Sequence, residues 1–187
     1  MQIIIGLGNP DEKYAFTRHN AGWLALDRLA GADDWRLEKK FNALTKEGGG
    51  YLYLKPLTYM NNSGESAYQA LRYYHLLTRQ FGYLLKKDQD LHQTLAVIHD
   101  DLDLALGAWK ISVDSRSGGH KGIQSLITCL KTQRFTRLRL GIKTEALHNP
   151  LPADKFVLQK FSTEELEILN ETLEPSLSQL REALNQK

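Results

Sequence analysis

Short apolar runs alternate along the chain with stretches of helical period. Ile3, Ile4 and Ile5 form a β-branched run that ends in the turn-like GLGNP, which predicts a buried strand followed by a loop. Apolar positions then recur at helical spacing from near Asn20 to Gly31, where the glycine is expected to end the helix. A strand followed at once by a helix is typical of an α/β fold.

The middle of the chain continues this alternation. A glycine-rich turn at 46–50 predicts a hairpin whose second strand ends at Pro56. Asn62 or Ser63 is expected to cap the next helix, because a side-chain oxygen there can accept a free amide of the first turn. The apolar run 94–99 predicts another strand, which gives way abruptly to the polar surface segment DDLDL.

The last third predicts a helix, a strand and a long helix. SRSGGHKG is typical of a flexible loop, and apolar residues at helical spacing follow from Ile123 to Leu130. RLRLGI alternates as a strand does, which places its arginines on one face. Ser162 and Glu165 predict a capping box for a leucine-striped helix, which Pro175 should kink or split.

The order of these elements predicts the fold class α/β: a single three-layer domain over 1–187, with a twisted mixed β-sheet flanked by helices. With 42% apolar and 25% charged residues, a chain of 187 residues can bury such a core without disulfides. Cys129, the only cysteine, lies in the apolar run SLITCL and is expected to be buried. No basic segment precedes the first apolar run and no stretch reaches membrane-span length, so a cytoplasmic protein is expected.

Charge is almost balanced over the whole chain, at +2, but it is unevenly distributed. Between Lys110 and Lys143 there are eight basic residues and one acidic residue, Asp114. A local basic field of this kind can bind phosphates even in a nearly neutral protein. The alternative is an ordinary solvated surface.

The candidate chemistry lies where predicted strands end. Asn9, Asn61 and Asp100 each follow such a strand, and the loops after strand ends collect functional groups in open α/β sheets. His19 lies beside a helix start, where a lone histidine is more often structural than catalytic. Its functional importance therefore depends on whether these loops converge around it.

Two other motifs suggest different chemistry, of which the first is rejected and the second is disfavoured. GLGNP lacks the third glycine of a dinucleotide-binding fingerprint and has Pro10 where that motif needs an amide-rich helix start. HDDLD offers His99, Asp100 and further aspartates as metal ligands, but neighbouring strand residues point to opposite faces and no recognised ligand spacing is present.

Several ordered blocks keep the residues and spacing of known signatures. They are GLGNPDEKYAFTRHNAG, PLTYMNNSG, AVIHDDLDLALG, SGGHKGIQSL and FTRLRLGI, followed near the C-terminus by the familiar FVLQKFSTEE. Together they resemble the bacterial-type peptidyl-tRNA hydrolase family. The resemblance implies a monomeric enzyme that hydrolyses the ester between a peptide and the 3′-terminal ribose of tRNA, with no metal or organic cofactor.

The resemblance also implies roles for individual residues. His19 corresponds to the catalytic base, Asp100 to the carboxylate that orients it, and Asn9 and Asn61 to amides that bind the substrate. These roles agree with the chemistry, because imidazole can deprotonate water near neutral pH. A neutral amide can also donate a hydrogen bond to the developing oxyanion.

Further positions match the wall and rim of the same site. Tyr14 and Met60 correspond to residues that line the substrate cleft, and His120 belongs to the glycine loop at its rim. Lys110 and Arg139 align with basic positions that the family uses toward tRNA, and their charge suits contacts with phosphate.

The chain departs from the family pattern in two places. Lys121 stands where the family usually has an asparagine that binds substrate, and a lysine could meet a tRNA phosphate but cannot copy an amide's paired donor and acceptor. The segment 77–93 is longer than expected, and its composition suggests an added helical turn or surface loop.

Two alternatives to the hydrolase hypothesis stay open. One is a catalytically inactive RNA-binding relative with the same fold, favoured only by Lys121 and opposed by the intact Asn9, His19, Asn61 and Asp100. The other is a hydrolase of small acyl esters or amides, which would need no basic stretch and should be insensitive to salt.

Overall fold

A mixed β-sheet forms the centre of the molecule. The computed structural model describes residues 1–80, 84–148 and 152–185. Its main sheet has seven strands in the order β2-β3-β4-β1-β7-β9-β8. The central four are parallel, and β2, β3 and β8 pair antiparallel at the two edges. The strands are β1 (Gln2–Gly6), β2 (Arg36–Glu38), β3 (Ala43–Gly48), β4 (Tyr51–Pro56), β7 (Leu95–Ala105), β8 (Trp109–Ser112) and β9 (Thr136–Lys143).

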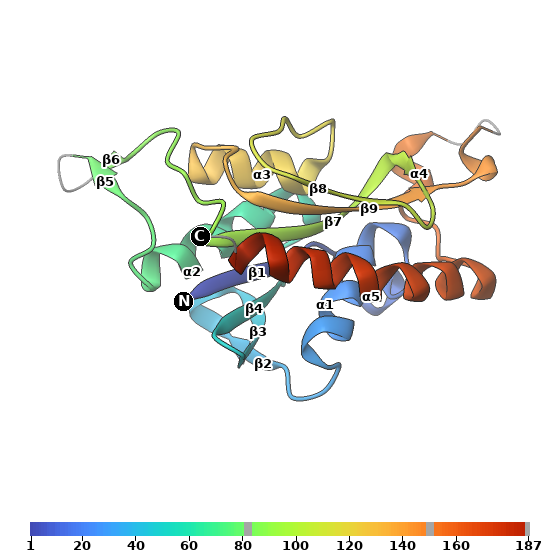
Figure 1. Cartoon of the computed structure of the whole chain (residues 1–187), viewed down its shortest axis with the longest axis horizontal. Helices are drawn as coiled ribbons and strands as arrows, with labels where there is room; N and C mark the ends of the chain where they lie inside the picture. Colours follow the sequence, from blue (N-terminus) through green and yellow to red (C-terminus); the bar gives the residue numbers. More distant parts are fainter. Residues whose placement is uncertain (81–83, 149–151, 186–187) are drawn as a thin grey trace.

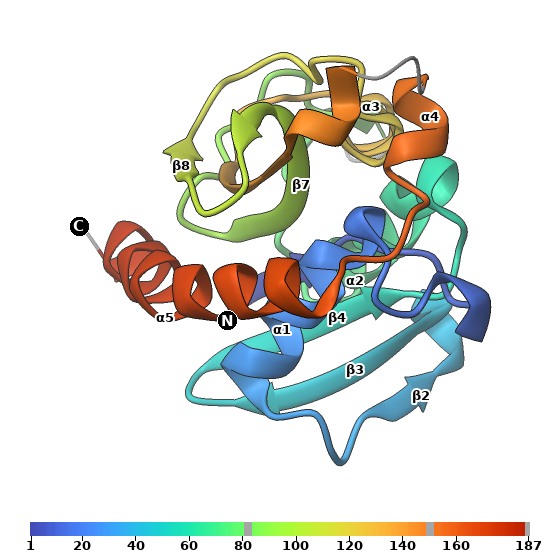
Figure 2. The ribbon, with the colours of Figure 1, turned by 90° about the vertical axis from the view of Figure 1, so that its right-hand side faces the viewer.

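Helices cover both faces of this sheet, which gives three layers (Figures 1 and 2). One buried cluster joins the sheet to α2 and α3, and a second joins its opposite face to α1 and α5. The helices are α1 (Ala21–Ala30), α2 (Ser63–Tyr73), α3 (Lys121–Leu130), α4 (Ala153–Phe156) and α5 (Thr163–Asn185). Short 3-10 turns occupy Glu12–Tyr14, Arg18–Asn20, Lys39–Phe41, Met60–Asn62 and Glu145–His148. The predicted three-layer α/β architecture with a mixed sheet is confirmed.

The first strand shows how the apolar pattern builds these layers. Ile3 and Ile5 pack into the α2–α3 cluster, whereas Ile4 packs into the α1–α5 cluster, and all three are fully buried. Uninterrupted β-branched runs are typical of parallel strands, because both faces of such a strand are covered. This strand ends in the loop that carries Asn9, so core packing positions one edge of the polar site.

Several local predictions are confirmed. Helix α1 begins directly after Asn20 and ends at Gly31, whose positive φ of 85° suits a glycine. β3 and β4 form the predicted hairpin. The capping box at the start of α5 is present, since Ser162 and Glu165 exchange side-chain and backbone hydrogen bonds.

The predicted cap of α2 is wrong. Neither the Asn62 nor the Ser63 side chain accepts a first-turn amide, and the Ser63 hydroxyl instead donates to the carbonyl of Met60. The Gly64 N–H donates to the Ser125 hydroxyl of α3 at 3.0 Å. A side chain of the neighbouring helix α3 therefore accepts a free amide at this end of α2, and local sequence does not encode that contact.

Three further expectations need correction in whole or in part. Of the kink or split expected at Pro175, the split is wrong, because helix α5 continues through Pro175 as one element. Of the helical turn or surface loop expected in the segment 77–93, the helical turn is wrong for the described residues, which instead form a small two-stranded sheet, β5 (Arg79–Gln80) and β6 (Leu84–Leu85); 81–83 lie outside the described residues. Cys129 is only partly buried.

None of the described helices is both long and apolar enough to cross a membrane. The long helix α5 instead lays an apolar stripe on the sheet, and its buried leucines are Leu169, Leu173, Leu177, Leu180 and Leu184.

Close packing of α2 against α3 predicts the effect of a small substitution. A Cβ at Gly64 would lie 2.3 Å from the Ser125 carbonyl oxygen, so Gly64→Ala should force the helices apart and lower the free energy of unfolding by about 1–3 kcal/mol. Gly48→Ala is the matched control, because a Cβ there would meet nothing closer than 3.9 Å. Urea denaturation of both variants measures their free energies of unfolding. Equal values for Gly64→Ala and Gly48→Ala would show that the helices can move apart without losing stability.

Candidate functional site

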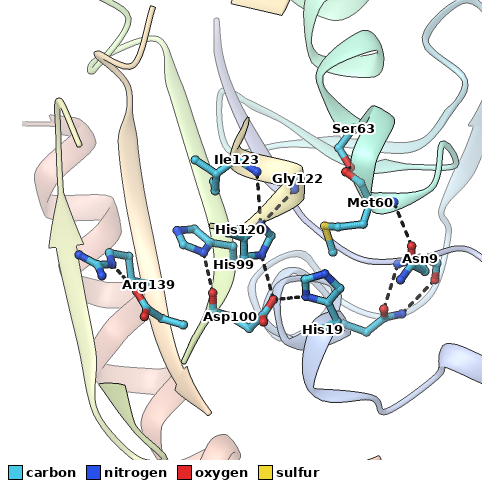
Figure 3. Close-up of polar contacts among 12 residues, drawn as sticks. Asn9, His19, Met60, Ser63, His99, Asp100, His120, Gly122, Ile123 and Arg139 are labelled. Carbon is cyan, nitrogen blue, oxygen red and sulfur yellow. Dashed lines mark hydrogen bonds and ion pairs between the residues drawn. The ribbon is translucent and has the colours of Figure 1, made fainter. Parts of the chain in front are cut away.

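A buried carboxylate and an imidazole meet at the centre of the site. His19 lies in the 3-10 turn before α1, and its Nδ1 is 2.9 Å from Oδ1 of Asp100 (Figure 3). The side chains are 11% and 2% exposed. The main chain also fixes the histidine, since its N–H donates to the carbonyl of Val157 at 2.8 Å. The predicted partnership of His19 with Asp100 therefore exists geometrically.

The environment of Asp100 decides its protonation. Burial alone would raise the pKa of Asp100, but electrostatic attraction to His19 and His120 and the hydrogen bonds from both rings hold that pKa well below its usual range. The carboxylate is thus ionised and can only accept hydrogen bonds. Nδ1 of His19 consequently carries a proton, and in the neutral ring Nε2 is left as the basic nitrogen.

The sequence pattern placed Asp100 in a loop after a strand, and this prediction is wrong. Asp100 lies within β7, which extends to Ala105 instead of ending near His99. Its neighbour His99 also lines the cleft, and the His99 ring packs against the ring of His120, which contacts the Asp100 carboxylate. Beyond Asp100, Asp101 forms an ion pair with Arg139, and its carboxylate also accepts the N–H of Asp103, two residues further on, as in an Asx turn.

The other side of the site is a network of amides. Asn9 accepts the N–H of Met60 through Oδ1 at 2.9 Å. The Asn20 side chain holds the Asn9 main chain from both directions, accepting its N–H at 2.9 Å and donating to its carbonyl at 3.0 Å. Because Oδ1 of Asn9 faces a donor, Nδ2 is the group that this side chain can offer as a donor. Asn9 is thereby an oriented hydrogen-bond donor.

Sequence reasoning missed Asn20. It stands directly after His19 in TRHN, and its residue type suits a locking role because an amide can both donate and accept. Its partner, however, is eleven positions away and meets it only in the fold.

These groups open into one cleft of about 790 Å³. Asn61 is exposed in the turn before α2, Met60 is buried, and Tyr14 is partly exposed. The sequence-predicted residues that line this cleft are Asn9, Tyr14, His19, Met60, Asn61, Asp100, His120, Lys121 and Arg139.

Lys110 lies outside the cleft lining but close to it. It is exposed on β8 and stands opposite Arg139 of β9 in the strand register. Arg139 is anchored by its ion pair with Asp101, and its side chain remains 24% exposed. Two cationic side chains therefore lie side by side at the edge of the cleft.

Arg137 belongs to the basic stretch between Lys110 and Lys143, but it is buried. It is 2% exposed and donates to the carbonyls of Ser115 and Arg116. Burial, reinforced by the charge of Arg139 and opposed by Asp114, lowers the pKa of Arg137 to about 10, so it remains cationic at neutral pH. Its role is to hold the loop before α3, not to present charge to solvent.

His19, Asp100 and His120 also form a group whose potential metal-ligating atoms all lie within 4.8 Å of one another. Each imidazole directs one nitrogen at the same Asp100 oxygen, and the other His120 nitrogen accepts two backbone amides. These hydrogen bonds account for the clustering of the three side chains. The HDDLD aspartates contribute no other member to this group.

Similarity to known proteins covers nearly the whole chain. A sequence model of the peptidyl-tRNA hydrolase family matches residues 3–187. The peptidyl-tRNA hydrolase of Bacillus thuringiensis subsp. konkukian is 36% identical, over 99% of this chain and 94% of that protein. That of Exiguobacterium sp. is 40% identical, over 95% and 90%. A crystal structure of peptidyl-tRNA hydrolase from Acinetobacter baumannii matches with a TM-score of 0.79 and 26% identity, covering 98% of this chain and 88% of that chain.

The state of Asp100 predicts a pH dependence of stability. Because its folded pKa is held below the unfolded value of about 3.9, the carboxylate contributes stability that is present above about pH 5 and is lost as the pH falls toward the folded pKa. The difference in free energy of unfolding between the parent chain and Asp100→Asn should therefore shift against the parent chain as the pH is lowered from about 5 to about 2. Urea denaturation across this range measures it. A constant difference would mean that Asp100 has the same pKa in both states.

Proposed function

The chain belongs to the peptidyl-tRNA hydrolase family, and we propose that His19, oriented by Asp100, activates the water with which it hydrolyses peptidyl-tRNA. The bond that is cleaved is the ester between the peptide and the 3′-terminal ribose, and the products are free tRNA and free peptide. The alternative of a catalytically inactive RNA-binding relative has no support from these similarities.

The observation that carries the catalytic proposal is the 2.9 Å contact between Nδ1 of His19 and the ionised Asp100, within a cleft that also holds the amides. Nε2 of His19 removes a proton from water as the oxygen attacks the ester carbonyl. When the tetrahedral intermediate collapses, the same nitrogen returns the proton to the departing ribose oxygen. Asp100 stabilises the imidazolium that exists between these two steps.

Two side-chain amides are suited to the developing oxyanion and the peptide. Asn61 is exposed at the cleft and can donate to the carbonyl oxygen without adding a charge. The Nδ2 group of Asn9 is oriented as a donor by the Met60 N–H, and in our proposal it binds a peptide carbonyl or the attacking water. Tyr14 and Met60 provide the apolar wall beside them.

The tRNA portion of the substrate is proposed to lie across the basic edge of the cleft. Lys110 and Arg139 are neighbours in the β8–β9 pair and can contact phosphates. Lys121, exposed at the start of α3, extends this positive edge and supplies a charge where the family usually has an amide. We further propose that the chain acts as a monomeric single domain in the cytoplasm.

Loss of the base should abolish most activity. His19→Ala is expected to reduce kcat for release of labelled peptide from a peptidyl-tRNA by roughly 10²- to 10⁴-fold, the usual contribution of a general acid–base group. His92→Ala is the control, because His92 lies outside the cleft lining and pairs with Asp90. Equal rates for the parent chain and His19→Ala would remove His19 from the mechanism.

The phosphate proposal predicts a salt effect. Lys110→Ala should raise KM several-fold with little change in kcat. It should also make the slope of log(kcat/KM) against log salt concentration shallower by about one, because one fewer counterion is released on binding. Lys87→Ala removes an exposed lysine outside the cleft lining and should change neither quantity. Activity that is insensitive to salt in the parent chain would instead favour a hydrolase of small acyl esters.

A further inference from the structure

We propose that His120 is a positioning residue, which fixes Asp100 and through it the His19 ring, instead of a substrate-binding group. This inference rests on the proposed function, because it concerns the orientation of the same base. It replaces the role expected for His120 from its place in the glycine loop. The side chain is 9% exposed, and both of its ring nitrogens have partners within the protein.

One nitrogen of His120 is held by the start of a helix. His120 is the N-cap of α3, and its Nδ1 accepts the N–H groups of Gly122 at 3.1 Å and Ile123 at 3.3 Å. A nitrogen that faces two N–H donors must present its lone pair. Nδ1 of His120 is therefore the acceptor in this geometry, and the ring proton that faces Asp100 is on Nε2.

The other nitrogen reaches the carboxylate. Nε2 of His120 lies 3.1 Å from Oδ1 of Asp100, the same oxygen that lies 2.9 Å from Nδ1 of His19 (Figure 3). Because the tautomer is set by the helix amides, Nε2–H donates to the carboxylate. Asp100 thus receives one donor from the base and one from α3, and the second donor restricts rotation of the carboxylate.

Packing supports this arrangement from two sides. The His120 ring lies 4.9 Å from the His19 ring and 4.8 Å from the His99 ring, measured between centroids. Nδ1 of His99 contacts the Asp100 carbonyl at 2.7 Å, so the three imidazoles surround one short piece of β7. The start of α3 also packs closely against its surroundings, because a Cβ at Gly122 would lie only 2.5 Å from the sulfur of Met60. A displacement of α3 would be transmitted to Asp100.

Two substitutions separate the functions of the two ring nitrogens. His120→Asn keeps an acceptor near the position of Nδ1 and can still cap α3, but it removes the donor to Asp100. His120→Gln places an amide N–H near the position of Nε2 and can restore that donor, while it loses the cap. A residue that served only to stabilise α3 would tolerate asparagine better than glutamine, whereas the positioning role predicts the opposite order of activity.

We expect His120→Asn to reduce kcat by roughly ten- to hundredfold with KM within about twofold of the parent value, because a hydrogen bond to a charged group is lost while the substrate contacts remain. His120→Gln should recover at least part of this loss in kcat despite a lower melting temperature. Higher kcat for asparagine than for glutamine, or a loss confined to KM, would overturn the proposal.

Nuclear magnetic resonance of ¹⁵N-histidine-labelled protein provides a readout that does not need substrate. The expected parent pattern is His120 protonated on Nε2 only and His19 protonated on Nδ1, with the His19 signals altered in His120→Asn. Protonation of His120 on Nδ1, or unchanged His19 signals, would contradict the positioning role. If this pattern holds but neither the parent chain nor the variants cleave peptidyl-tRNA, the proposed function fails and the positioning of Asp100 stands.

Discussion

The site depends on one costly feature, an ionised carboxylate buried inside a central strand. Removing the charge of Asp100 from water is unfavourable unless donors replace the lost hydration. His19 and His120 supply these donors, and they come from the turn before α1 and from the start of α3. The need to compensate one charge therefore fixes three elements relative to one another, and it leaves the basic nitrogen of His19 directed away from Asp100.

The C-terminal segment is the second support of the base. Arg18, next to His19, forms two hydrogen bonds to Glu165 and donates to the carbonyl of Lys160. Its guanidinium lies over the ring of Phe156 at 4.5 Å, and the side chain is almost completely buried. Together with the bond from His19 N–H to the Val157 carbonyl, these contacts connect the turn before α1 to the segment that leads into α5. Long-range packing thus sets the backbone position of the catalytic candidate.

Local sequence predicts those features that local interactions determine. The isoleucines of β1, the end of α1 at Gly31 and the capping box of α5 could all be inferred, because propensity, turn chemistry and apolar period act over a few residues. The cap of α2 could not be inferred, since Ser125 reaches it from another helix. The same limit hid Asn20 as the partner of Asn9. Roles for His19 and Asp100 came from resemblance, whereas their contact emerged only from the fold.

The central claim is that His19 and Asp100 act as one unit, and a double-mutant cycle tests it most directly. The quantity to measure is kcat for peptidyl-tRNA hydrolysis in His19→Ala, Asp100→Asn and the double variant. If Asp100 acts by orienting His19, the double variant should be no slower than His19→Ala alone, because the carboxylate has nothing left to orient. Effects that multiply in the double variant would show that the two residues contribute independently and would contradict the account.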